Sequence, residues 1–529
     1  MPGKYVKKKK FPWIPVLILV FLAVAALVLV LFLGGRDTQE PTEPIQTSAP
    51  TVPETTVPPT TVPPTTVPEE IEVVVSTASF TVTGDLLMHK PVFQSCWDNE
   101  KGDWVFDCLF THVTPYIQQA DYAIANLETT LRGENGTYPY SGNPLFNCPD
   151  GIAPASLNAG FDMLLTGNNH CYDTRMLGIR RTLEILEQTG LESLGTQYDA
   201  ETPDHKVIEV NGIKVGMTAY TAETYDGMPG VPSINAIQCH PDSFGMINSF
   251  DYGQLEKFYT EIGAQFELMK AEGAEAIVVF MHWGEEYQLE PTEYQQKIAQ
   301  KLCDMGVDVI VGGHPHVVEP VDLLTSAEDE NHKTLIIYST GNAVSNQRIH
   351  EMRMKSGHTE DGILFNFTLA KYLDGSVEVI ATSCTPTWVY MVGNKESYTI
   401  LPLDYSLQES WQETFQIDDQ TLAACVSSYD RTMELVGAGL EKAQTWFDTR
   451  HEAKTEYLQD PAWSEPTEPP TEPTEATEPA TIPIGEAEGT ASTETTGETT
   501  PTETDSDSAP SETGTETTPT ETGAEEPTE

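Results

Sequence analysis

Seven ionisable or amide side chains share one sequence context, because each lies at the end of a short apolar run. They are Asp85, Glu128, Asn169, His170, His282, His314 and His316. A single histidine in such a place would be explained by a hydrogen-bonded position in the core, but this many side chains favour a shared chemical role. Imidazole, carboxylate and amide oxygen together suit Mn, Fe, Zn or a similar divalent cation. The pattern therefore predicts a metal centre.

The stretch VDVIVGGHPH ends in His314 and His316, which are separated by Pro315. The proline stiffens the turn and fixes the direction of both rings, so that each imidazole can face a different metal ion. Two cations about 3.5–4 Å apart and bridged by a carboxylate clamp a phosphate and lower the pKa of a bridging water. We therefore expect two divalent ions and a site suited to attack of water on phosphorus.

The elements that must position these residues are buried strands. The apolar runs are rich in Val, Ile and Leu, and segments with helical character, such as residues 174–190 and 291–306, lie between them. Buried strands that alternate with helices favour an α/β fold whose central sheets are covered on both faces. In open α/β sheets, sites form beyond the carboxyl ends of the strands, which is where the ionisable residues fall.

These motifs resemble a known family. The ordered set TGDLLMH, ANLE, GNNHCYD, HWGEEY, GGHPHVVEP and YSTGN, between Ser79 and Trp388, is similar to the CapA family of capsule (poly-γ-glutamate) biosynthesis proteins. That family belongs to the calcineurin-like metallophosphoesterase superfamily. The resemblance implies a four-layer sandwich of two mixed β-sheets flanked by helices, with two metal ions at the strand ends.

The resemblance also implies a role for each residue of the set. Asp85 opens the first metal site, and Glu128 stands where the superfamily has a bridging aspartate. Asn169 corresponds to a metal ligand, and His170 to a catalytic histidine that steadies the leaving group or the transition-state charge. The three remaining histidines divide between the two ions, with His282 and His314 on one metal and His316 on the other.

Two positions depart from the pattern of the superfamily. Leu87 occupies the histidine position of the usual Asp-x-His block, and His89, two residues later, is the candidate replacement ligand. Glutamate in place of aspartate at position 128 lengthens the bridging side chain by one methylene. These departures leave open whether one metal site is weak or empty, and they put turnover in question more than metal binding.

Other polar or aromatic residues near the motifs have two readings each. Asp173 either orients His170 as a carboxylate partner, a catalytic role, or caps a helix. Trp283 and Glu285 either line a substrate pocket or, for the tryptophan, fill the core. Asn342 either contacts substrate or forms a turn with the glycine before it. Asn168 completes the set of candidate substrate contacts.

The composition limits the partners of this protein. The formal net charge is -53, and no basic patch accompanies the motifs, so we expect no nucleic-acid partner. The eight cysteines form no CxxC pair, which argues against a zinc knuckle. We expect most of them to be small buried residues, with Cys96 and Cys108 the nearest candidates for a disulfide.

The chain divides into segments of different composition. We expect a cytoplasmic basic segment (1–10), a single-pass transmembrane anchor (11–35), a disordered Pro/Thr/Glu-rich stalk (36–70), the CapA-like domain (71–403), appended helices (404–460) and a disordered acidic tail (461–529). Lysines before the apolar stretch predict a cytoplasmic N-terminus and an extracellular main domain. A cleaved signal peptide is the alternative, although its apolar region would be shorter, about 7–15 residues.

Together these features predict a membrane-anchored extracellular CapA-type protein of capsular poly-γ-glutamate biosynthesis or export, with a metal-dependent phosphoesterase-like site. Its expected partners are a membrane polyglutamate synthase complex and an anionic polymer or phosphoester substrate. One alternative is a non-catalytic metal-binding partner of a membrane polymer synthase. Another is a cell-surface nucleotidase-type phosphohydrolase.

Overall fold

The computed structural model describes residues 73–134, 137–224, 230–393, 396–460 and 463. The predicted cytoplasmic segment, transmembrane anchor and stalk lie outside the described residues, as does all of the acidic tail except Trp463. In the part of the chain that is described, no helix combines the length and the apolar character needed to cross a membrane.

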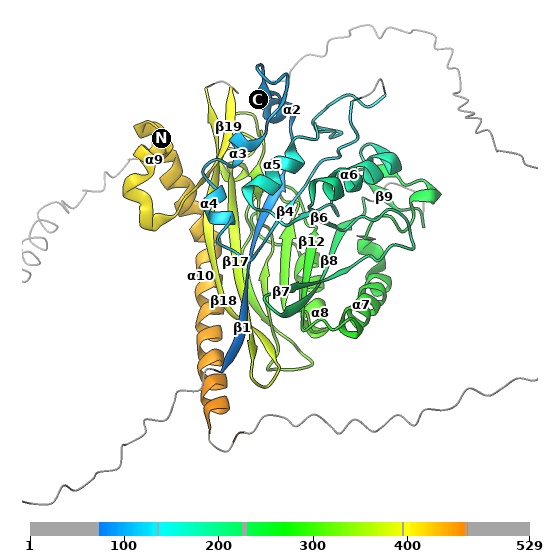
Figure 1. Ribbon diagram of the computed structural model, residues 1–529, viewed down its shortest axis with the longest axis vertical. Coiled ribbons are helices and arrows are strands. Elements are labelled where there is room, and N and C mark those ends of the chain that lie inside the picture. The colour runs from blue at the N-terminus through cyan, green and yellow to red at the C-terminus, as the bar shows by residue number, and fades with distance from the viewer. Residues whose placement is uncertain (1–72, 135–136, 225–229, 394–395, 461–462, 464–529) are drawn as a thin grey trace, which may run out of the picture. The chain divides into compact units, whose positions relative to one another are not determined.

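Two mixed β-sheets form the centre of the described fold (Figure 1). In the eight-stranded sheet the order is β19-β18-β17-β1-β4-β5-β6, and β16 pairs with β1. Its strands are β1 (Val74–Leu86), β4 (Tyr122–Asn126), β5 (Met163–Leu165), β6 (Glu192–Leu194), β16 (Asn342–Val344), β17 (Asp361–Tyr372), β18 (Val377–Val392) and β19 (Ser397–Pro402).

In the seven-stranded sheet the order is β11-β8-β12-β13-β15-β14, and β7 pairs with β8. Its strands are β7 (Lys206–Val210), β8 (Ile213–Ala222), β11 (Ser249–Phe250), β12 (Ala276–His282), β13 (Val309–Gly313), β14 (Val321–Thr325) and β15 (Lys333–Ile337). Two short hairpins lie outside the sheets and consist of β2 (Trp97–Asp98) with β3 (Asp103–Trp104), and β9 (Ser233–Ile234) with β10 (Ile237–Gln238).

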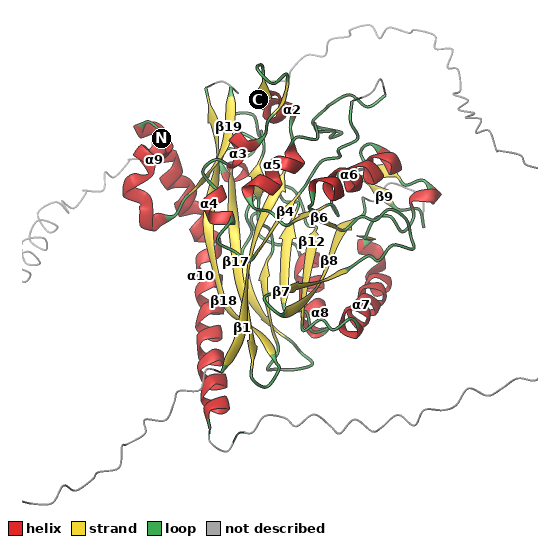
Figure 2. Cartoon of the chain, viewed as in Figure 1, coloured by secondary structure: helices red, strands yellow, loops and turns green. Residues whose placement is uncertain are grey.

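Helices lie outside the strands, as Figure 2 shows in red and yellow. They are α2 (Lys90–Ser95), α3 (Asp107–Phe110), α4 (Thr114–Ile117), α5 (Ile152–Ala159), α6 (Arg175–Thr189), α7 (Leu255–Ala271), α8 (Glu293–Asp304), α9 (Trp411–Phe415) and α10 (Asp419–Gln459). Helix α8 begins with a capping box in which Thr292 and Gln295 satisfy each other's free backbone donors.

The two sheets pack face to face, and strand β12 shows why. All seven of its residues are buried, and side chains alternate between the two faces of a strand. Val278 and Phe280 enter the core between the sheets, whereas Ile277 and Val279 pack on the other side beneath α7 and α8. Helices α2 to α5 cover the outer face of the eight-stranded sheet in the same way. The predicted α/β fold, with mixed sheets flanked by helices, is confirmed.

Within the segment predicted to carry appended helices, residues 419–459 form one continuous helix. Gly437 and Gly439 lie inside α10, which continues through both. A β-carbon at Gly439 would lie 1.8 Å from the carbonyl oxygen of Val321 in β14, so this glycine permits close packing. Val436 and Phe447 of α10 join the core between the sheets, and the helix is therefore part of the main fold.

The cysteines are all free thiols in the described residues, and six of the eight are buried. Cys96 and Cys108 are the candidate pair named from the sequence. Their Sγ atoms lie 3.8 Å apart and do not form a disulfide.

Candidate metal centre

The registers of the strands bring the predicted metal ligands to one edge. In the parallel ladders, Asp85 of β1 pairs with Asn126 of β4, and His282 of β12 pairs with Gly313 of β13. Glu128 follows β4 by two residues, and the histidines of the HPH sequence follow β13 directly. Side chains from opposite sheets therefore meet beyond the carboxyl ends of the strands, as expected for an α/β sheet.

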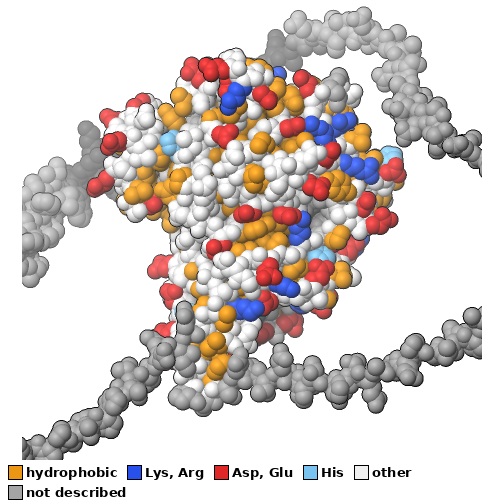
Figure 3. Space-filling view, in the orientation of Figure 1, with side chains coloured by type: hydrophobic (Ala, Val, Ile, Leu, Met, Phe, Trp, Pro, Cys, Tyr) orange, Lys and Arg blue, Asp and Glu red, His pale blue; other side chains and the backbone are white. Residues whose placement is uncertain are grey.

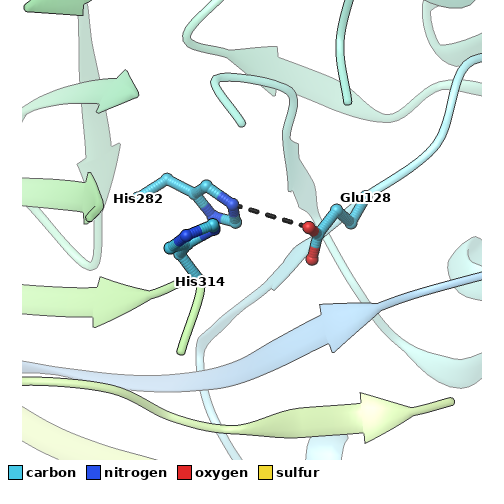
Figure 4. Close-up of side chains that lie close together, drawn as sticks. All are labelled: Glu128, His282 and His314. Carbon is cyan, nitrogen blue, oxygen red and sulfur yellow. Dashed lines mark ion pairs between the residues drawn. The ribbon is translucent and has the colours of Figure 1, made fainter. Parts of the chain in front are cut away.

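Two groups of side chains have the types and spacing to hold a metal ion. One contains Asp85, Glu128 and His316, and the other contains Glu128, His282 and His314. Within each group the candidate ligand atoms all lie within 4.8 Å of one another. Figure 4 shows His282 and His314 directed toward Glu128, whose Oε1 lies 3.5 Å from Nε2 of His282. Glu128 is common to both groups and occupies the bridging position.

Glu128 is the most informative residue of this centre. Its side chain is fully buried, yet neither of its carboxylate oxygens has a hydrogen-bond partner. Burial raises the pKa of Glu128 to about 8, and the nearby charge of Asp85 adds to the effect. A buried carboxylate without hydrogen bonds is destabilising, and a bound divalent cation would compensate its charge. The residues present therefore fit a bound metal pair.

Asp85 and His316 form a buried ion pair. Their Oδ2 and Nδ1 atoms lie 3.0 Å apart. Burial by itself would raise the pKa of Asp85, but the hydrogen bond and charge of His316 outweigh it, and the pKa falls to about 2. Burial would likewise lower the pKa of His316, but Glu128 and Asp85 raise it to about 9. The carboxylate of Asp85 is thus held ionised, the form in which it binds a cation.

The pKa values of His282 and His314 are shifted in the opposite direction to that of His316. Burial lowers the pKa of each to about 3, so both rings are neutral at physiological pH. A neutral imidazole is the form that coordinates metal, so His282 and His314 are ready to bind a cation, whereas His316 would release its proton on binding one. Nδ1 of His314 is buried without a hydrogen-bond partner, and Nε2 of His282 lies 2.8 Å from Oδ1 of Asn169. The amide of Asn169 is therefore placed to complete the second group.

The backbone around the HPH sequence is unusual. His314 has a φ of 96°, His316 a φ of 57°, and Tyr287, whose N–H donates to the carbonyl of Pro315, a φ of 66°. Left-handed conformations are uncommon for residues with a β-carbon and concentrate at functional sites. Here they turn both imidazoles into the same pocket.

His170 lies beside the metal groups with its Nε2 atom 3.9 Å from Oε1 of Glu128. Its Nδ1 atom lies 2.8 Å from Oδ2 of Asp173, which is fully buried. Burial opposes protonation, but the hydrogen bond and charges of Asp173 and Glu128 raise the pKa of His170. Thr174 occupies the cap position of α6, so of the two readings for Asp173 the structure favours orientation of His170.

His89 is not brought into either metal group. Its Nδ1 atom accepts a hydrogen bond from the backbone N–H of Asn346, and burial lowers its pKa to about 4. Leu87, at the position where the superfamily has a histidine, is buried in the core. In the described residues the first group therefore consists of three side chains, and His89, the candidate replacement ligand, is not among them.

Three of the four candidate substrate contacts lie in the interior, where they hold the structure together. Trp283 is fully buried, and its indole N–H donates to the carbonyl of Tyr338. Asn342 is fully buried and donates to the carbonyls of His316 and Thr359. Asn168 is also fully buried and donates to the carbonyl of Leu127.

The fourth candidate, Glu285, is exposed, and its neighbour Glu286 is the residue whose charge acts on the site. The negative charge of Glu286 counts among the influences that raise the pKa values of His282, His314 and His316. Both glutamates are exposed, and neither belongs to a metal group in the described residues.

Sequence reasoning missed two residues that support the centre. Asn126 donates to Oδ1 of Asp85 and accepts from the amide of Asn168, which fixes the carboxylate. Its position in the ANLE motif, at the end of β4, was the available signal. The ring of Phe146 makes edge contacts with both His89 and His170 at centroid distances of 5.3 and 4.5 Å, and no local pattern marks it.

Two mixed sheets packed face to face, with histidines and carboxylates gathered at the strand ends, define an α/β protein with a candidate metal centre. The family described as bacterial capsule synthesis protein PGA_cap matches residues 79–347, just over half of the chain. The protein thus belongs to this CapA family of capsule synthesis proteins, and the resemblance drawn from the motifs is confirmed.

Two curated relatives carry the same name. The capsule biosynthesis protein CapA of Bacillus anthracis is 28% identical over 272 residues, which cover 51% of this chain and 60% of that protein. The PGA biosynthesis protein CapA of Bacillus subtilis (strain 168) is 26% identical over 357 residues, which cover 65% of this chain and 83% of that protein.

Among solved structures, the chain is similar to the calcineurin-like phosphoesterase YfkN from Bacillus subtilis. The identity is 16% and the TM-score is 0.32, with coverage of 67% of this chain and 99% of that chain.

Proposed function

We propose that this protein is a membrane-anchored, extracellular CapA-type protein that hydrolyses a phosphate ester with two divalent cations during production or export of a capsular polyglutamate. The observation that carries the proposal is Glu128, a fully buried carboxylate whose two oxygens have no hydrogen-bond partner and which is shared by two ligand groups. Cations held by the two groups would compensate its charge.

In this proposal Asp85, Glu128 and His316 would hold one cation, and Glu128, His282 and His314 would hold the other, with Asn169 beside the second group. Bound cations of this kind supply a Lewis acid for the phosphoryl oxygens and an activated water. The remaining work belongs to the chain. Asn126 keeps Asp85 oriented, and four of the ligands are buried, namely Asp85, Glu128, His282 and His316.

His170 serves as the proton donor to the leaving oxygen. Asp173 holds Nδ1 of the ring, so that the opposite nitrogen, Nε2, faces the pocket near Glu128. The raised pKa of His170 keeps more of the ring in the protonated form, which can either donate a proton or stabilise negative charge.

The test uses the full-length protein extracted in detergent. Divalent metal content is measured by mass spectrometry, and turnover is measured with a chromogenic phosphate ester after Mn, Fe or Zn is supplied. We expect bound metal and turnover in the wild type, and less bound metal with loss of turnover in His316→Ala. Metal-free wild-type protein, with His316→Ala indistinguishable from it in every assay, would refute the proposal.

A second candidate function is a non-catalytic metal-binding partner of a membrane polymer synthase. The observation that favours it is the buried Leu87 together with the exclusion of His89 from the metal groups, which leaves the first group with three ligands. Cations held there would grip a polyanion without hydrolysing it. Metal retained without turnover, together with co-purification of a synthase, would select this candidate, whereas turnover would exclude it.

The surface charge agrees with a substrate other than a long nucleic acid. On the face shown in Figure 3, basic side chains occur singly or in small groups among acidic ones. A small nucleotide is therefore the remaining substrate of the nucleotidase alternative, and hydrolysis of nucleoside monophosphates in the same assay would identify it. Cleavage of the C-terminal tail by protease added to intact cells would test the proposed extracellular orientation.

A further inference from the structure

The hairpin formed by β9 and β10 lies far from the metal ligands in sequence but reaches His170. Its two-residue turn consists of Asn235 and Ala236, which both have positive φ, 50° and 58°. Asparagine tolerates this conformation, whereas alanine rarely adopts it. A strained turn is retained where contacts with the surrounding structure stabilise it. Here the stabilising contacts include hydrogen bonds from Asn235 to residues beside His170.

The side-chain amide of Asn235 meets the pair formed by His170 and Asp173. Its Nδ2 atom donates to Oδ1 of Asp173 at 2.9 Å and to the carbonyl of Pro144 at 3.2 Å. The same atom lies 3.3 Å from Nδ1 of His170. The other oxygen of Asp173 already serves Nδ1 of His170 and the backbone N–H of Phe146. Asn235 therefore satisfies the one carboxylate oxygen that would otherwise be unpaired in the interior.

This geometry selects the tautomer of His170. The two hydrogens of the Asn235 amide have two acceptors, Asp173 and Pro144, so none is left for the imidazole. Nδ1 of His170 must then carry the hydrogen that it donates to Asp173. The free position of the neutral ring is consequently Nε2, the nitrogen that faces Glu128.

The hairpin is fixed to the same segment by packing. Ile234 is fully buried in an apolar cluster with Tyr172 and Cys239. The hydroxyl of Tyr172 accepts hydrogen bonds from the backbone N–H of His240 and the hydroxyl of Ser243, which follow the hairpin. Tyr172 lies between His170 and Asp173 in sequence. Apolar packing from the hairpin and hydrogen bonds from the loop after it therefore both hold this short segment.

We propose that Asn235 is a positioning residue that acts through Asp173 to fix the orientation and tautomer of His170. The expected effect on turnover rests on the proposed function, whereas the expected effect on the orientation and tautomer of His170 does not. It assigns the β9–β10 hairpin to the site, although the hairpin carries no metal ligand and no motif.

The test compares three variants of the full-length protein. Asn235→Gly keeps the left-handed turn and removes the amide, Asn235→Asp replaces the donor by an acceptor facing Asp173, and Ala236→Gly relaxes the turn and leaves the amide in place. Loss of a partner that orients an active-site group lowers activity about 10–100-fold. We expect that fall in kcat, with KM and metal content unchanged, in both Asn235 variants but not in Ala236→Gly.

A second readout does not depend on activity. In metal-free protein, carbethoxylation of His170 is followed by peptide mass spectrometry, and we expect at least a threefold change in its rate in Asn235→Gly relative to wild type and to Ala236→Gly. Unchanged carbethoxylation in both Asn235 variants would overturn the inference. If the wild type has no phosphoesterase activity but the carbethoxylation rate changes as expected, the proposed function fails and the positioning role stands.

Discussion

Replacement of Glu128 by glutamine tests two expected effects of its buried carboxylate. The carboxylate should destabilise the metal-free protein, and it should provide the ligand through which metal stabilises the protein. The substitution keeps the shape of the side chain and removes its charge. Without metal, this should stabilise the protein, because the folded state no longer holds a carboxyl group whose pKa is raised from 4.5 to about 8. With metal, it should remove the bridging ligand and therefore most of the stabilisation that cations provide.

The magnitude follows from proton linkage. A folded pKa above the unfolded value means that the folded state binds more protons, so stability falls as the pH rises from about 4.5 to about 8. At pH 7 the interval from 4.5 corresponds to about 3 kcal/mol, at about 1.4 kcal/mol per pH unit. Metal-free Glu128→Gln should gain up to about that amount. A cation at 100 times its Kd would stabilise the wild type by about 2.7 kcal/mol, and the variant by much less.

Glu319 provides a matched control. Its carboxyl group is also fully buried, one of its oxygens has no partner, and burial likewise raises its pKa to about 8, but it belongs to neither metal group. Its other oxygen accepts a hydrogen bond from Gln295, which a glutamine at position 319 can still receive. Glu319→Gln should therefore stabilise the metal-free protein at pH 7–9 without changing the response to metal.

The assay is urea unfolding followed by tryptophan fluorescence, at pH 5, 7 and 9, with a chelator or with Mn²⁺. A response to Mn²⁺ that is equally large in wild type and Glu128→Gln would refute the assignment of Glu128 as the bridging ligand. A loss of that response in Glu319→Gln would show that any buried carboxyl group has the same effect, and the argument from Glu128 would fail.

Two further predictions concern metal content and packing. His314→Ala should lower bound divalent metal in mass spectrometry of the full-length protein, whereas His89→Gln should leave it unchanged, because His89 lies outside both groups; equal loss in the two variants would restore His89 as a ligand. In α10, Gly437→Ala should raise the free energy of unfolding by about 0.5–1 kcal/mol, since alanine is the better helix former and the added β-carbon meets only the end of a flexible methionine. Gly439→Ala should instead lower it by at least about 1–3 kcal/mol, because its β-carbon would overlap the backbone of β14; urea unfolding of both variants distinguishes these signs, and equal effects would contradict the packing argument.

The position of the site could be predicted from the sequence because the carboxyl ends of parallel strands meet at one edge of a sheet. Apolar runs such as that of β12 are recognisable in the sequence, and the residues after them must gather at one edge of the sheet. This rule brought together His282 and the histidines after β13, although about thirty residues separate them. It works because the side chains concerned leave the strand at its last residue or soon after it.

The same rule could not assign the direction of each side chain. His282 and Trp283 are neighbours at the end of β12, so they point to opposite faces. The histidine enters the site and the tryptophan enters the core beneath α8. Asn342 begins β16, but its side chain turns inward to hold the HPH loop. Proximity to a strand end indicates a site, but the alternation of faces decides which of the residues belong to it.

The contribution of Asn235 lay beyond any rule based on periodicity. The hairpin follows no long apolar run, and its turn residues, Asn-Ala, lack the glycine that usually marks such a turn. What places it at the site is a buried isoleucine and an amide that completes the hydrogen bonds of a buried carboxylate. Contacts of this kind depend on the folded structure as a whole. Such contacts orient the groups that act on substrate. The chemistry of this site therefore also depends on residues, such as Asn235, that lie outside the metal-ligand motifs.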